Sequence, residues 1–233
     1  MSHCILVVML LAMLMGAHTS WGLEQKILTQ SDVEVTVIHF HQTTQQNLAN
    51  SSGRINTTLT FDDIHLPDPV SNISRYANFN LTSFQIFDPI LASKAGLFPP
   101  EDTNCATSSP NALLGSRPTT GTWPRLILDP SNSTDPSYFH IQSFAIKALG
   151  LVPRDLALHV NGFEITNGKV VTMYQAFVMY LRTGYQGMFV LDFARLGWWP
   201  KRINALEFWA QTSDGRKDWK FCIDDLKIAL VGS

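Results

Sequence analysis

The chain has 233 residues, of which 45% are hydrophobic and only 15% charged, and its formal net charge is −2. Charges this sparse and balanced argue against a nucleic acid or an anionic membrane surface as a partner. The length suffices for one β-sandwich or β-barrel domain with a sizeable core.

Residues 1–22 have the character of a secretory signal. A short polar start is followed by an apolar run, Ile5 to Met15, and by small residues that end at Gly22. The run is shorter than the roughly 20 residues that a membrane span requires. The start lacks the usual Lys or Arg. We expect cleavage after Gly22 and a location outside the cell or in the secretory lumen.

Two further features fit that compartment. Once Cys4 has left with the signal, Cys105 and Cys222 are the cysteines that stay, and an even pair in an oxidising compartment predicts one disulfide. Asn-x-Ser/Thr triplets lie in polar segments and predict glycosylated surface loops. Their acceptors are Asn50, Asn56, Asn72, Asn80 and Asn132.

Strand and turn signals alternate along most of the chain. Residues 23–58 form a polar N-terminal arm with one strand-like run at 33–41, and residues 59–233 form the main domain. No helical period of useful length occurs after the signal, so we predict an all-β fold, a single antiparallel β-sandwich. The predicted strands span residues 59–64, 78–87, 125–128, 138–149, 156–165, 170–181, 188–193, 202–211 and 219–230.

Asn167-Gly168 lies between two of these strands and favours a type I′ hairpin turn, because both positions then have positive φ. In the last strand, Phe221 and Ile223 share one parity, whereas Leu226 and the apolar residues after it share the other. Both sets face one core only if the strand contains a bulge, which we place at Asp224 and Asp225.

Four aspartates are candidate metal ligands. The opening and closing strands of a sandwich lie close together, so Asp62 and Asp63 would approach Asp224 and Asp225. With backbone carbonyls they would supply the oxygen ligands of a structural calcium ion. The alternative is that these carboxylates face solvent or cap turns. No motif for an organic cofactor or a hydrolase nucleophile is present.

Two predicted strands, 170–181 and 188–193, are apolar on both faces. A sandwich strand normally has one polar face, so the second face needs a cover: a loop, a partner subunit or an apolar ligand. We take Val178 and Phe189 as candidate contacts for that cover.

Strand parity selects the remaining candidate residues. Leu158 and Leu206 point to the core, which turns His159, Phe163, Glu207 and Trp209 to the opposite face, and we place Tyr174 there with them. His159, Glu207 and Tyr174 are candidate acid–base groups, and Arg195 is a candidate anion clamp. Candidate binding aromatics are Phe163, Trp209 and the consecutive pair Trp198 and Trp199.

Several motifs resemble secreted fungal β-sandwich proteins with a galactose-binding-like jelly roll, a resemblance that covers roughly residues 59–230. The motifs stand at Phe61-Asp62-Asp63, 104–106, 109–113, 139–144, Gly184-Tyr185, 203–210 and 219–226. In general character the chain is also similar to fungal hetero-Diels-Alderases, which couple a tropolone-type o-quinone methide to a sesquiterpene.

Three functions follow as hypotheses. The first is an enzyme without organic cofactor, in which an acid dehydrates a hydroxymethyl aromatic or tropolone precursor and apolar walls guide its addition to a terpene. Tyr174 or Arg195 would stabilise charge on the quinone oxygen. The second is a lectin-like module that binds carbohydrate or cell wall through flat-lying aromatics. The third is a secreted interaction protein whose doubly apolar strands form a homodimer interface.

Overall fold

The computed structural model describes residues 21–30, 33–42, 54–116, 121–129, 136–198, 201–216 and 219–232. Residues 1–20 of the predicted signal 1–22 lie outside these ranges, as do Asn50, Asn132 and Trp199. The elements are β1 (Trp21–Gln30), β2 (Val33–Gln42), β3 (Arg54–Leu59), β4 (Val70–Asn72), β5 (Arg75–Tyr76), β6 (Phe79–Thr82), β7 (Phe84–Phe87), α2 (Pro89–Lys94), the 3₁₀ helix η1 (Pro100–Cys105), β8 (Ala112–Gly115), β9 (Arg125–Leu128), β10 (Pro136–Ala148), β11 (Ala157–Thr166), β12 (Lys169–Tyr180), β13 (Phe189–Asp192), β14 (Ala205–Gln211) and β15 (Phe221–Gly232).

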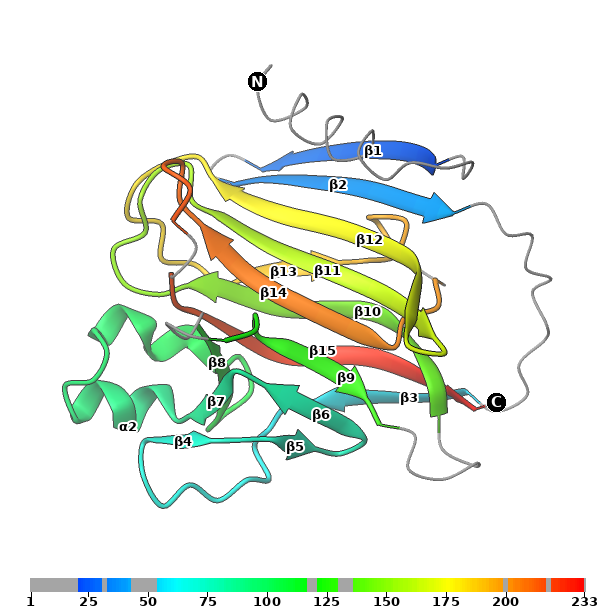
Figure 1. The fold of residues 1–233 in the computed structure, drawn as a ribbon. Helices are drawn as coiled ribbons and strands as arrows, with labels where there is room; N and C mark the ends of the chain where they lie inside the picture. The colour runs from blue at the N-terminus through cyan, green and yellow to red at the C-terminus, as the bar shows by residue number, and fades with distance from the viewer. Residues whose placement is uncertain are drawn as a thin grey trace.

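The fold is an antiparallel β-sandwich, as predicted (Figure 1). One sheet has eight strands in the order β1-β2-β12-β11-β14-β9-β6-β5, and the other has seven described strands, β13-β10-β15-β8-β7-β4 with β3 beside β15. The core between them is apolar and rich in aromatic rings, such as Phe139, Phe144 and Phe208. The sheets thus pack by the alternation that the sequence displays.

The Asn167-Gly168 hairpin is confirmed, because Thr166 pairs with Lys169 across it and the two turn residues have φ values of 51° and 72°. The bulge in β15 is confirmed as well. Ser143 pairs with Lys227 and Ala145 with Asp224, so β15 advances three residues where β10 advances two. Asp225 takes up the extra length at a φ of 50°.

Several boundaries differ from the sequence prediction. The segment taken as a polar arm contributes β1 and β2 to the eight-stranded sheet and β3 to the other. The strand predicted at 59–64 is wrong, since β3 ends at Leu59 and the positive φ of Phe61, 64°, turns the chain away. Ser83, with a φ of 58°, divides the predicted strand 78–87 into β6 and β7, which belong to different sheets.

A second, smaller core lies outside the seven-stranded sheet, beside α2 and η1. Phe87, Ala92 and Leu149 contribute to it, together with the disulfide between Cys105 and Cys222. The cysteine Cα atoms lie 5.9 Å apart, and the bond ties η1 to β15 as the cysteine count predicted. No helix in the described part of the chain has the length and apolarity needed to cross a membrane.

Candidate functional site

A row of aromatic side chains crosses the outer face of the eight-stranded sheet. His159 on β11 pairs in register with Phe177 on β12 and with Trp209 on β14. The rings of His159 and Trp209 are stacked, 4.7 Å between centroids and 2° from parallel, and Trp123 lies 5.8 Å beyond Trp209. The rings therefore pack against one another, and their edges rather than their faces point away from the sheet.

A polar row runs beside the aromatic one, two residues further along the strands. Asn161 on β11 is paired in register with Glu207 on β14, and Glu207 in turn with Arg125 on β9. The Arg125 guanidinium donates to one Glu207 carboxylate oxygen through both Nε and Nη2. Arg125 also lies 6.0 Å from the ring centroid of Phe163, a cation–π contact. Glu207 is thus charge-paired and only 8% exposed.

Two neighbouring residues of this face each have a buried polar atom without a hydrogen-bond partner among the described residues. The two atoms are the indole Nε1 of Trp209, a donor, and the amide Oδ1 of Asn161, an acceptor. The two residues are diagonal neighbours on adjacent strands. Because buried polar groups are nearly always satisfied, such a pair is a place where water or a ligand group can bind.

Parity placed four of the predicted site residues correctly. His159, Phe163, Glu207 and Trp209 share the outer face, while Leu158, Val160, Leu206 and Phe208 are buried in the core. The sequence did not identify Arg125 as the partner of Glu207. The pairing of β9 with β14 joins segments about 80 residues apart, and no local sequence pattern reveals such a pairing.

Three predicted site residues lie in the core instead. Tyr174 pairs with Gly162, whose parity is that of the inner face, and contacts Trp198 at 5.7 Å between ring centroids. Burial, and then the charge of Glu164, raises the pKa of Tyr174 to about 12. Val178 and Trp198 are fully buried. The prediction that Tyr174 and Val178 lie on an exposed face was wrong. Both faces of β12 carry apolar residues, so alternation alone does not show which face points to the core.

Arg195 and Phe189 are also remote from the outer face. Arg195 lies on a turn, where its side chain is 81% exposed and forms an i,i+3 ion pair with Asp192. Phe189 is partly buried against the core from β13. Because β13 pairs with β10 in the seven-stranded sheet, the two doubly apolar strands do not lie side by side.

The four candidate calcium ligands bind protein groups in the structure. Asp224 accepts hydrogen bonds from the backbone N–H groups of Thr107 and Ser108 at 2.7 and 3.0 Å, and Asp62 accepts one from Asn111 at 3.0 Å. The two carboxylates therefore hold opposite ends of one loop. Asp225 accepts from the Thr107 hydroxyl at 2.8 Å.

Asp63 accepts from the hydroxyl of Tyr76 at 2.7 Å. Burial, and then this hydrogen bond, raises the pKa of Tyr76 to about 12. Within the described ranges, no group of three or more His, Cys, Asp or Glu side chains is placed to hold a metal ion. The calcium site therefore stays a prediction from the sequence.

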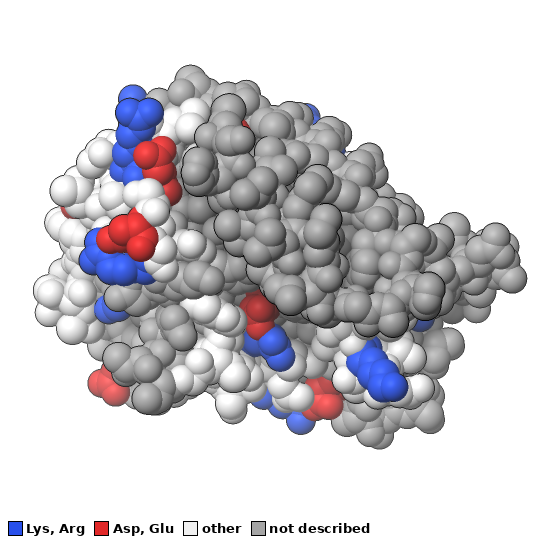
Figure 2. All heavy atoms as spheres, turned by 45° about the horizontal axis from the view of Figure 1, so that its top comes forward, with Lys and Arg blue, Asp and Glu red and all other residues white. Residues whose placement is uncertain are grey.

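The surface gives context for this site. Figure 2 shows Lys and Arg side chains next to Asp and Glu in small mixed groups, without an extended patch of one sign among the residues drawn in colour. Of the predicted glycan acceptors, Asn56, Asn72 and Asn80 are exposed on strands. Their glycosylation stays a prediction.

No family model and no curated protein matches the chain. Among solved structures the chain is similar to the crystal structure of a DUF4465 family protein from Bacteroides caccae. The two share 9% identity, and the comparison covers 92% of this chain and 94% of that one with a TM-score of 0.43. Function is not inferred from a likeness at this level.

Proposed function

We propose that this chain is a secreted carbohydrate-binding protein that binds a polyhydroxylated ligand on the outer face of its eight-stranded sheet. The observation that carries the proposal is the buried, unsatisfied pair of Trp209 Nε1 and Asn161 Oδ1. A sugar hydroxyl accepts one hydrogen bond and donates another. Neighbouring hydroxyls of one saccharide would therefore satisfy both atoms at once.

The surroundings of this pair favour the same ligand class. Arg125 and Glu207 form a planar, charge-paired group beside it, and such groups bind vicinal hydroxyls through several hydrogen bonds. The stacked row of rings fixes Trp209, so little side-chain entropy is lost on binding. The faces of Trp209 already contact His159 and Trp123, so recognition would rely on hydrogen bonds at the ring edges. A flat aromatic platform, as the sequence suggested, is not what these rings form.

A binding experiment with two variants tests the proposal. Soluble oligosaccharides of glucose, xylose, mannose and N-acetylglucosamine are titrated into the protein and into Trp209→Phe, which keeps an aromatic ring but loses the N–H. We expect one sugar class to bind, and the variant to bind it about three- to tenfold more weakly, the effect of one lost hydrogen bond. Asn161→Leu should lose affinity similarly.

Trp219→Phe is the matched control, because the Trp219 Nε1 already donates to Leu149 O at 2.9 Å. Its affinity for the sugar should equal that of the native chain. If no oligosaccharide binds, or if Trp209→Phe and Trp219→Phe bind equally well, the unsatisfied atoms merely hold water and the proposal is wrong.

The hetero-Diels-Alderase hypothesis is a second candidate, favoured by the row of rings in which His159 stands between Phe177 and Trp209. If the chain is such an enzyme, His159 would be the acid. Arg125 would stabilise charge on the quinone oxygen, the role that the sequence analysis gave to Tyr174 or Arg195. Adduct formation from a hydroxymethyl tropolone and humulene would then proceed faster than the spontaneous reaction, and His159→Gln would abolish the difference. A rate equal to the spontaneous one would eliminate this candidate.

A further inference from the structure

A separate cleft of about 330 Å³ lies at the end of the molecule that carries α2 and η1. Its walls are mostly apolar, and one side of its mouth is cationic. Its lining includes Leu97, Phe98, Asp102, Arg216, Trp219 and Lys220. The volume is at the lower end of the range of about 300 to 1,000 Å³ that is typical of small-molecule sites.

The two rings of this cleft are held in fixed positions. Trp219 donates its Nε1–H to Leu149 O at 2.9 Å and packs against the main core. Phe98 packs against Phe87, 5.4 Å between ring centroids, in the smaller core. A flat apolar guest would therefore meet preformed walls, which lowers the entropy lost on binding.

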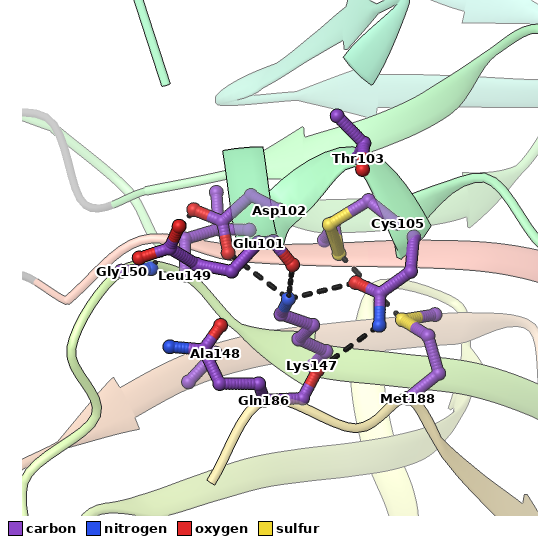
Figure 3. A network of polar contacts seen from close by, with 12 residues as sticks. Glu101, Asp102, Thr103, Cys105, Lys147, Ala148, Leu149, Gly150, Gln186 and Met188 are labelled. Carbon is purple, nitrogen blue, oxygen red and sulfur yellow. Dashed lines mark hydrogen bonds and ion pairs between the residues drawn. A yellow bond between two sulfur atoms is a disulfide. The ribbon is translucent and has the colours of Figure 1, made fainter. Parts of the chain in front are cut away.

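Asp102, which lines the cleft, is already neutralised by the buried Lys147. Figure 3 shows the fully buried Lys147 ammonium surrounded by oxygens of η1. Lys147 Nζ lies 3.0 Å from Asp102 Oδ1 and donates to Glu101 O at 2.6 Å and to Asn104 Oδ1 at 2.7 Å. The other oxygen, Asp102 Oδ2, accepts from the Gly150 N–H at 2.9 Å. Asp102 therefore offers little net negative charge to a guest.

The charge at the mouth is positive. Arg216 forms an ion pair with Asp214 at 2.8 Å, which leaves Lys220 as the unbalanced charge among the described residues that line the cleft. Lys220 is exposed, and within the described ranges no carboxylate forms an ion pair with it. Its Nζ lies 5.4 Å from the centroid of the Phe98 ring, so the cation is positioned at the apolar wall.

We infer that this cleft is a second ligand site, for a small organic anion with a flat apolar body and one carboxylate. The ring of the guest would lie between Phe98 and Trp219, and its carboxylate would bind Lys220. Neither the sheet face nor the carbohydrate ligand proposed above enters this argument.

Calorimetric titration with benzoate, and with its neutral analogue benzamide, tests the inference on the whole chain. We expect benzoate to bind one site and benzamide to bind about three- to fivefold more weakly, because the contact with the exposed ammonium is lost. Lys220→Gln should weaken benzoate binding by the same factor. Lys227→Gln is the matched control, since Lys227 is exposed on β15, about 20 Å along the chain from Lys220.

Trp209→Phe, which tests the sheet face, should leave benzoate binding unchanged, so the two sites succeed or fail separately. The inference is overturned if native protein does not bind benzoate. It is equally overturned if Lys220→Gln and Lys227→Gln bind benzoate with the same affinity.

Discussion

At the scale of single residues, the packing leaves no room for a side chain at Gly115. A Cβ atom built on Gly115 would lie 2.3 Å from Cζ of Phe221, whose ring is buried in the core. Gly115→Ala should therefore lower the free energy of unfolding by about 1 to 3 kcal/mol, the cost of overpacking. Urea denaturation measures this. Gly232→Ala, where the new Cβ meets nothing within 4 Å, serves as control and should change little.

Asp224 gives stability a pH dependence of unusual sign. Burial raises the pKa of Asp224 from 3.8 to about 6, although hydrogen bonds from Asp225, Ser108 and Thr107 act in the opposite direction. A carboxyl whose folded pKa lies above its unfolded pKa stabilises the fold at low pH and loses that contribution as the pH rises. This contribution to the unfolding free energy should thus fall by about 2 kcal/mol between roughly pH 4 and pH 6.

Denaturation at several pH values, with native protein and Asp224→Asn, checks this. The difference in stability between the two should change across that window and become constant above about pH 7. A difference that grows in the reverse direction, with native protein gaining on the variant as the pH rises, would show that the hydrogen bonds outweigh the burial.

At the scale of elements, η1 depends on a buried ion pair. Lys147 and Asp102 are both at most 1% exposed and lie on β10 and η1. Lys147→Met would leave the Asp102 carboxylate buried without its cation, which should cost about 3 to 5 kcal/mol. The double variant Lys147→Met/Asp102→Leu should regain part of that loss. Equal stability of native protein and Lys147→Met in urea would contradict this role.

At the scale of elements, the sequence predicts the direction of side chains on some strands and not on others. Strong alternation places β11 and β14 correctly, and with them the outward direction of His159 and Glu207. Alternation fails for Tyr174, because both faces of β12 are partly apolar. The Lys147 network was missed, since a single Lys in an apolar strand gives no signal until η1, more than 40 residues away, is folded against it.

At the scale of the whole molecule, the Cys105–Cys222 disulfide joins the smaller core to the last strand and spans 117 residues of sequence. Replacing both cysteines by alanine should lower stability by about 2 to 5 kcal/mol, since the unfolded chain gains freedom. Thermal and urea unfolding of native and double-variant protein measure the difference. An unchanged midpoint would mean that the two cores hold η1 in place without the bond.

The proposed function depends on the outer sheet face as a carbohydrate site, and one nuclear magnetic resonance titration tests it most directly. The chain has six tryptophans, and each indole N–H in a ¹⁵N-labelled sample gives its own signal. The signal missing from Trp209→Phe identifies Trp209. Addition of the bound oligosaccharide should shift the Trp209 signal and leave that of Trp219 in place. A saturating titration in which the Trp209 signal does not move would contradict the account.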